Sequence, residues 1–116
     1  MTTRKALKFS AELVPLILSG EKSATWRLFD DKNLTVGDEL ALVNAATLEI
    51  FAAAKIAHIR IKMIREITEA DYVGHEKFPD NDHMLAWYQQ NYREPVDWGT
   101  PVKMIDFELL PSSSRS

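Results

Sequence analysis

The sequence predicts a small α+β domain in which about five to six strands curl into a barrel and two main helices complete the core. A chain of 116 residues is large enough for one hydrophobic core but not for two. Several short runs alternate apolar and polar residues, as strands do, and two longer runs carry apolar residues at helical spacing. So small a sheet tends to curl, because closure removes its open edges.

A strand and a helix are expected first. Residues 5–9 are apolar at alternate positions and are typical of a strand. Ser10 can cap a helix that begins at Ala11, and Gly20 is suited to end it. Pro15 lies deep enough in this helix to delete one hydrogen bond, so we expect a kink or a late helix start.

Two further strands are expected before the middle of the chain. Residues 22–29 alternate loosely and carry Thr, Trp and Phe, which favour strands. A polar loop at 30–33 and a Val-Gly-Asp turn at 36–38 lead into an apolar strand at 39–43. A second turn follows at 44–47.

The segment 48–67 fits either a helix or a strand. Its apolar residues recur at helical spacing, but over 57–63 they also alternate with His58, Arg60 and Lys62. The density of isoleucine and the lack of a capping residue before the segment favour a long, twisted strand. The curled sheet is then expected to enclose Phe9, Leu40, Leu42, Ile59, Ile61, Ile105 and Phe107.

The second half of the chain contains the other main helix. Thr68 and Asp71 resemble a capping box that opens a short helical turn. Asp80 or Asn81 can cap a longer helix that runs to Tyr92 and buries an apolar face.

A final strand at 102–110 closes the domain. We therefore expect one domain over residues 1–110 and a polar tail, 111–116, without fixed structure.

Composition narrows the class of protein. The chain has no cysteine, which excludes disulfides, thiol nucleophiles and thiolate metal sites. It has no apolar run of membrane-spanning length and no secretory leader at its start, so we expect a cytoplasmic protein that does not contact membranes. The net charge of −3 suits a nucleoside-sized ligand better than a long nucleic acid, which needs one cation for each phosphate it neutralises.

An ordered set of motifs follows the first helix. G-x-K-x-x-T-x-R occupies residues 20–27, and the Val-Gly-Asp turn occupies 36–38. Together with the segments 67–78 and 102–109, this set resembles the ASCH domain family, whose fold is a PUA-like β-barrel. The resemblance extends over roughly residues 5–110. The residues that match the family's signature one by one are Gly20, Lys22, Thr25, Arg27, Gly37 and Asp38.

One branch of this family resembles amidohydrolases that remove the acetyl group from N(4)-acetylcytidine, with K-x-x-T-x-R and a downstream glutamate. The resemblance implies that Lys22, Thr25 and Glu76 are catalytic, with Glu66, Glu69 and His75 as alternatives near the third position. The predicted substrate-binding residues are Arg27, Gly20, Asp38 and Trp98.

Amide hydrolysis would use these side chains in distinct roles. Thr25 supplies a hydroxyl nucleophile, Lys22 could be its base, Glu76 could serve the leaving amine, and Arg27 could hold a carbonyl or phosphate. On an ideal strand, residues 25 and 27 share a face while residue 22 points to the other. Lys22 must therefore lie in an irregular stretch just after Gly20, or at a bulge.

Other interpretations stay open. The family's likeness to PUA domains implies association with RNA, and some members are described as ribonucleases. A non-catalytic RNA-binding module or a ribonuclease is therefore an alternative. Many members carry an acidic residue where this chain has Thr25, so the threonine favours the amidohydrolase. The expected partner is a nucleoside or single-stranded RNA.

Each of these residues also has a simpler structural interpretation. Lys22 can be a solvated turn residue, Thr25 a plain strand residue, and Glu76 an exposed acid in a loop. The row Lys55, His58, Arg60 and Lys62 could bind RNA phosphates or be the solvent face of a strand. The three histidines show no ligand spacing, so we expect no metal and no cofactor.

Overall fold

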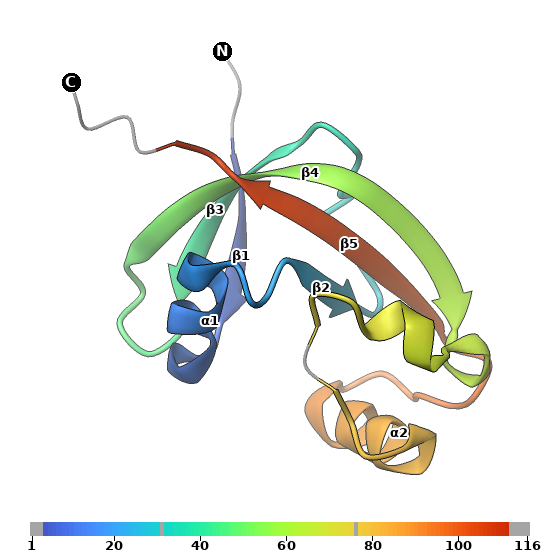
Figure 1. Cartoon of the computed structure of the whole chain (residues 1–116). Helices are drawn as coiled ribbons and strands as arrows, with labels where there is room; N and C mark the ends of the chain where they lie inside the picture. The colour runs from blue at the N-terminus through green and yellow to red at the C-terminus, as the bar shows by residue number, and fades with distance from the viewer. Residues whose placement is uncertain (1–3, 31, 76, 112–116) are drawn as a thin grey trace.

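The computed structural model describes residues 4–30, 32–75 and 77–111. It confirms the predicted class, because a five-stranded mixed sheet curls into a half-barrel accompanied by two helices (Figure 1). The prediction for the tail falls mostly on residues 112–116, which lie outside the described part. The strands are β1 (Lys5–Phe9), β2 (Ala24–Arg27), β3 (Glu39–Asn44), β4 (Ile50–Met63) and β5 (Pro101–Leu109).

The strand order places the first two strands at opposite edges of the sheet. The order is β1-β3-β4-β5-β2, with β1 and β3 parallel and the other neighbours antiparallel. β1 and β2 are therefore the edge strands, and the curl of the sheet turns these edges toward each other.

The first helix begins late, as Pro15 predicts. A 3-10 turn, Ala11–Leu13, precedes α1 (Val14–Ser19), and Pro15 lies in the first turn of α1, where its missing N–H costs no helical hydrogen bond. Ser10 precedes the 3-10 turn, but its side chain makes no capping hydrogen bond. Gly20 ends α1 in the left-handed conformation, with φ of 87°.

The segment 48–67 is a strand, as the isoleucine content predicts. β4 runs through fourteen residues and then passes into a 3-10 turn, Ile64–Glu66. Leu42 and Val43 mark an irregularity in its pairing with β3, and a bulge lies between Ile56 and His58 in its pairing with β5.

The helix caps of the second half are also as predicted. The backbone N–H of Thr68 donates to Asp71 Oδ2 (2.8 Å), which completes a capping box before the 3-10 turn Glu69–Tyr72. Asp80 caps α2 (Asn81–Asn91) by accepting a hydrogen bond from the backbone of His83 (2.8 Å).

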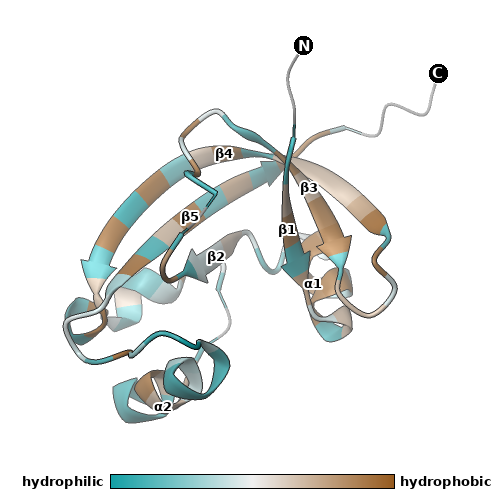
Figure 2. Ribbon diagram, turned by 180° about the vertical axis from the view of Figure 1, so that it is seen from behind, coloured by the Kyte–Doolittle hydropathy of each residue, from teal (hydrophilic) through white to brown (hydrophobic). Residues whose placement is uncertain are grey.

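Two apolar clusters form the core, on opposite faces of the sheet. The first lies between α1 and the concave face, along β1 and β3, where apolar residues gather in Figure 2. The second lies under α2 and the neighbouring turns. β5 belongs to both, because Ile105 and Phe107 enter the first cluster and Val102 and Met104 enter the second.

This change of face explains one wrong prediction. Ile61 is 64% exposed, although the alternation of β4 predicted that it would be enclosed. It pairs with Lys103, on the face that carries the first cluster at the other end of the sheet. At this end the core has moved to the opposite face, so Ile61 faces solvent. Of the other residues predicted to be enclosed, Ile59 is partly buried against the first cluster and the rest are buried in it.

Candidate functional site

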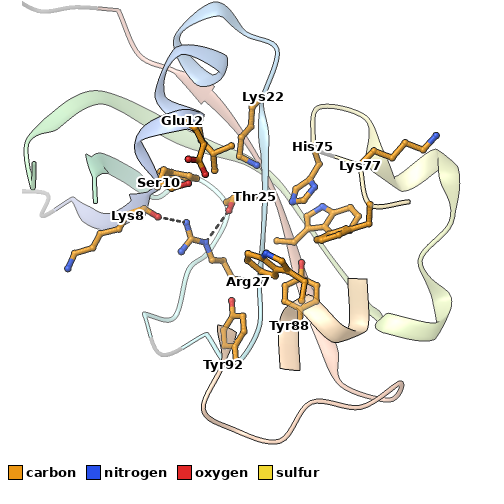
Figure 3. A pocket seen from close by; sticks show the side chains of 15 residues that line it. Lys8, Ser10, Glu12, Lys22, Thr25, Arg27, His75, Lys77, Tyr88 and Tyr92 are labelled. Atoms are coloured by element: carbon orange, nitrogen blue, oxygen red, sulfur yellow. Dashed lines mark hydrogen bonds between the residues drawn. The ribbon is translucent and has the colours of Figure 1, made fainter. Parts of the chain in front are cut away.

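A cavity of about 440 Å³ opens between the two edge strands (Figure 3). Its wall combines β1, the turn before α1, β2, the loop that follows residue 74, and α2. Segments that are far apart in the sequence therefore meet at one place. The lining residues are Lys8, Phe9, Ser10, Glu12, Leu13, Lys22, Thr25, Trp26, Arg27, His75, Lys77, Phe78, Trp87, Tyr88 and Tyr92.

The alternation of β2 places Thr25 and Arg27 on one face. Thr25 pairs with Ile105 of β5, and Arg27 pairs with Lys103 two residues further along. Trp26 lies on the opposite face, beside Met104, where it joins the second apolar cluster. Thr25 is 5% exposed, yet its hydroxyl is part of the cavity wall rather than of either apolar cluster.

Arg27 links the two edges of the sheet. Its Nε donates a hydrogen bond to Thr25 Oγ1 (3.1 Å), and its Nη2 donates to the carbonyl oxygen of Lys8 in β1 (3.2 Å). The guanidinium also lies 5.1 Å from the centre of the Phe9 ring, within cation–π range. Burial lowers the pKa of Arg27, and the nearby Tyr92, Tyr88 and Asp30 offset this only in part.

Lys22 lies before β2, in the irregular stretch that its spacing required. β2 begins at Ala24, two residues later than the predicted strand, because the backbone N–H of Lys22 donates a hydrogen bond to the carbonyl of Leu16 in α1 (3.0 Å). The side chain is 4% exposed and lines the cavity, and its Nζ donates to the carbonyl of Ala24 (2.7 Å).

The loop after residue 74 is attached to β2 by its backbone. The carbonyl of Gly74 accepts hydrogen bonds from the N–H groups of Ser23 (2.8 Å) and Ala24 (3.0 Å). Gly74 has φ of 75°, and a Cβ at this position would overlap with Ser23 Oγ. His75 follows and stacks on Trp26, with ring centres 4.1 Å apart and planes 17° apart. The left-handed backbone and the close contact with Ser23 both favour glycine at this position, where the loop is held beside β2.

The structure brings Lys22, Thr25 and Arg27 together at the cavity, and Glu76 lies outside the described residues. The other candidates are elsewhere. Gly20 ends α1. Trp98 is in the loop before β5, is 37% exposed, and accepts a hydrogen bond from the Arg65 N–H through its carbonyl.

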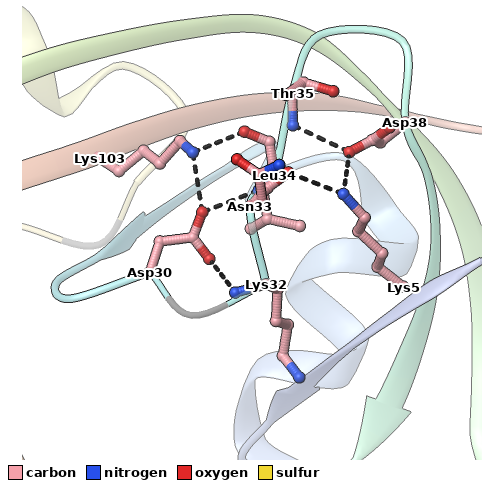
Figure 4. A network of polar contacts seen from close by, with 8 residues as sticks. All are labelled: Lys5, Asp30, Lys32, Asn33, Leu34, Thr35, Asp38 and Lys103. Atoms are coloured by element: carbon pink, nitrogen blue, oxygen red, sulfur yellow. Dashed lines mark hydrogen bonds and ion pairs between the residues drawn. The ribbon is translucent and has the colours of Figure 1, made fainter.

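Asp38 belongs to a polar network that fixes the loop between β2 and β3 (Figure 4). Its carboxylate pairs with Lys5 Nζ (2.8 Å) and accepts from the N–H of Thr35 (2.9 Å). These hydrogen bonds, with that from Lys5 the largest, lower the pKa of Asp38. In the same network Lys103 pairs with Asp30 (2.8 Å). Asp38 therefore has a structural task that requires no ligand.

Several residues that line the cavity were not among the predicted site residues. Lys8 and Glu12 come from segments read as a plain strand and helix, and nothing in their spacing distinguishes them. His75 was an alternative for the downstream acid. Tyr88 is buried in the second apolar cluster and Tyr92 packs against that cluster, and both also line the cavity.

Two members of the basic row on β4 are engaged in ion pairs. Arg60 and Lys62 both bind the carboxylate of Asp71, at 2.8 Å and 2.9 Å, and only 4% of the Asp71 side chain is exposed. Burial alone would raise the pKa of Asp71, but the hydrogen bonds from Arg60, the Thr68 N–H and Lys62 hold it well below its usual range. Two of the four side chains of the row are therefore held by one internal carboxylate, which offsets one of their two positive charges.

Asp71→Asn is expected to destabilise the protein by about 1–3 kcal/mol at pH 7, because it removes hydrogen bonds between charged groups. The folded-state pKa is depressed, so this stabilisation exists above the unfolded-state pKa of about 3.9 and is lost as pH falls below it. Urea unfolding at pH 7 and at about pH 2.5 measures the difference, which should shrink in acid. The exposed Asp82→Asn is the control; equal stability of wild type and D71N at pH 7 would contradict the expectation.

Two further features bear on the class of protein. None of the helices in the described ranges is both long and apolar enough to cross a membrane. Across the same ranges, no three His, Cys, Asp or Glu side chains are grouped so that they could hold a metal ion.

Comparison with known proteins shows the fold. No family model matches the sequence, and no curated protein matches it. A solved structure from Enterococcus faecalis V583, of the family DUF984, is 16% identical, with a TM-score of 0.78 over 95% of this chain and 82% of its own. An ASCH domain from Lactobacillus crispatus JV V101 is 19% identical, with a TM-score of 0.65 over 92% of this chain and 79% of its own.

A more distant match, ASCH from Zymomonas mobilis, is 10% identical, with a TM-score of 0.59 over 89% of this chain and 65% of its own. These TM-scores establish a shared fold, and identities this low leave the activity open. The chain therefore has the fold of the solved ASCH domains.

Proposed function

We propose that the protein hydrolyses the exocyclic amide of an acylated pyrimidine nucleoside of the N(4)-acetylcytidine type. One observation carries the proposal. The hydroxyl of Thr25 is buried in the wall of a cavity, accepts a hydrogen bond from Arg27, and shares that wall with the buried amino group of Lys22. A nucleophile, a candidate base and a cation then converge on one space of ligand size.

Arg27 prepares the Thr25 oxygen for attack. Because Nε donates to Oγ1, the hydroxyl hydrogen of Thr25 must point away from Arg27 and is available to a base. The positive charge also favours the alkoxide that forms as this proton leaves. A plain strand threonine needs neither contact.

The reaction divides into two steps. Thr25 Oγ1 attacks the acetyl carbon while its proton passes to Lys22, and the C–N bond breaks as that proton passes to the cytosine amine. A water molecule then cleaves the acetyl ester, which releases acetate and restores the hydroxyl. Lys22 accepts a proton only as the neutral amine, a form that burial favours, and its side chain is 4% exposed.

The remaining wall suits a flat, partly apolar ligand. Trp26 and His75 stack on each other at its side, and Tyr88 and Phe78 continue the aromatic surface. Aromatic faces of this kind bind nucleobases by stacking, which makes a pyrimidine ring a fitting occupant. The cavity volume of about 440 Å³ is also in the range of small-molecule sites.

The test is to assay wild-type protein with N(4)-acetylcytidine and with single-stranded RNA in parallel. We expect cytidine and acetate to appear in equal amounts, measured by chromatography, while the RNA stays intact. If the protein does not hydrolyse the nucleoside but binds RNA with an affinity that falls steeply as salt rises, the proposed hydrolase is wrong and the protein is an RNA-binding module. If the protein cleaves the RNA, the proposed amidohydrolase is wrong and the protein is a ribonuclease.

A further inference from the structure

We infer that the ligand of the cavity carries a phosphate group bound by Arg27, so that the preferred substrate is a nucleotide rather than a free nucleoside. The inference rests on the proposed function only for the identity of the base. It rests on charge and burial for the phosphate.

The first argument is the distribution of charge. Among the described residues that line the cavity, three basic side chains other than the proposed base Lys22 are present (Lys8, Arg27 and Lys77), and one acidic side chain, Glu12. The chain as a whole has a net charge of −3. Although the protein is acidic overall, basic side chains outnumber acidic ones around this opening. Such an arrangement attracts an anion.

The second argument is the environment of Arg27. Its two hydrogen-bond acceptors, the hydroxyl of Thr25 and the carbonyl of Lys8, are both uncharged. Within the described ranges no carboxylate lies at ion-pair distance from its guanidinium. Burial already disfavours this charge, as its lowered pKa indicates. A bound anion would supply the missing counter-charge.

Lys103 provides the contrast within the same protein. Its side chain is also largely buried, but its ammonium group pairs with Asp30 at 2.8 Å and donates to the carbonyl of Leu34. The charge of Lys103 is therefore balanced by Asp30, and its contacts stabilise the loop between β2 and β3. Among the described residues Arg27 has no comparable carboxylate, although its planar guanidinium is well shaped to bind phosphate with two parallel hydrogen bonds.

The position of Arg27 leaves room for a phosphate beside the base. Arg27 and Tyr92 line both the main cavity and a second one of about 250 Å³, so they lie at the partition between the two. Lys32 adds a cation to the second cavity. Phe29, also in its wall, is 39% exposed and has φ of 52°, a conformation that costs free energy for a residue other than glycine.

Lys8 and Lys77 play a smaller part. Both lie at the rim, and in Figure 3 both side chains point away from the centre of the cavity. Lys77 is also engaged by the exposed carboxylate of Glu69. They add to the field that draws an anion toward the opening, whereas Arg27 makes the contact.

The test compares cytidine with its 5′- and 3′-monophosphates, the products of the proposed reaction, by isothermal titration of the wild-type protein. We expect at least one monophosphate to bind about 10- to 100-fold more tightly than cytidine at low salt, and this gap to narrow as salt rises. Cytidine binding as tight as that of both monophosphates would overturn the inference.

Arg27→Gln identifies the residue responsible. Glutamine keeps a hydrogen-bond donor and removes the charge, so the gap between monophosphate and nucleoside should close. Arg65→Gln, which makes the same change of net charge away from both cavities, should keep the gap. Circular dichroism checks that R27Q is folded, and the wild-type comparison decides the inference by itself if R27Q is not.

Hydrolysis of N(4)-acetylcytidine and its 5′-monophosphate separates this inference from the proposed function. If both are hydrolysed equally and the monophosphates bind no more tightly, the inference fails and the hydrolase stands. If neither is hydrolysed but a monophosphate binds more tightly in an Arg27-dependent way, the hydrolase fails and the inference stands.

Discussion

Thr25→Val is expected to abolish hydrolysis of N(4)-acetylcytidine while leaving the protein folded. Valine has nearly the volume of threonine and suits a strand, so no large cavity opens in β2. The variant loses the nucleophile, and removal of such a group lowers the rate by more than the roughly 10²–10⁴-fold that one proton transfer contributes. Steady-state kcat/KM, with a thermal unfolding curve for each protein, measures both halves of the expectation.

Lys22→Met should have a similar effect, because it removes the base and keeps most of the buried side-chain volume. Its matched control is Lys55→Met, on the exposed part of β4, which should leave kcat/KM unchanged. Thr47→Val, in the turn between β3 and β4, is the corresponding control for Thr25. Full activity in T25V would show that Thr25 is a structural residue of the strand and would refute the nucleophile assignment.

Gly74→Ala is expected to lower both stability and activity. The left-handed backbone of Gly74 costs about 1–2 kcal/mol when a side chain is added, and the new Cβ would overlap with Ser23 Oγ. Relief of this overlap moves the loop away from β2 and weakens the hydrogen bonds that Gly74 accepts from Ser23 and Ala24. His75 would then shift relative to Thr25. Urea unfolding and kcat/KM report the two losses.

Two companion variants separate the causes. Gly37→Ala has a comparable φ of 92° but meets no atom within 4 Å, so it carries the backbone cost without the overlap. Ser23→Ala combined with Gly74→Ala removes the overlap and should recover part of the stability and activity. If G74A lost no more stability than G37A and kept full activity, the attachment of this loop to β2 would have no role in the site.

Local sequence patterns were sufficient for most of the fold. The isoleucine content and missing cap identified β4, and Pro15 gave the late start of α1. Ile61 shows where such reasoning fails. Alternation reports which residues share a face, but the core changes from one face of the sheet to the other along β5. That change depends on where α2 packs, which no short segment encodes.

The residues of the candidate site also differ in whether local sequence patterns could predict them. Thr25 and Arg27 follow from strand alternation, and the irregular stretch needed for Lys22 follows from its spacing. Lys8 and Glu12 reach the cavity because edge strands and turns from distant parts of the chain meet there. Asp38, like Gly20, was a candidate by resemblance, and the structure gives it a structural task in fixing a loop.

The contact between Arg27 and Lys8 has a consequence for the architecture itself. A sheet with two free edges risks pairing with another chain, and a barrel normally avoids this by joining its first and last strands. Here the side chain of Arg27 spans the seam, and the space beside it is the cavity. One more strand at this seam would protect the edges better and would remove the binding site. The incompleteness of the barrel is thus what gives the protein a place for a ligand.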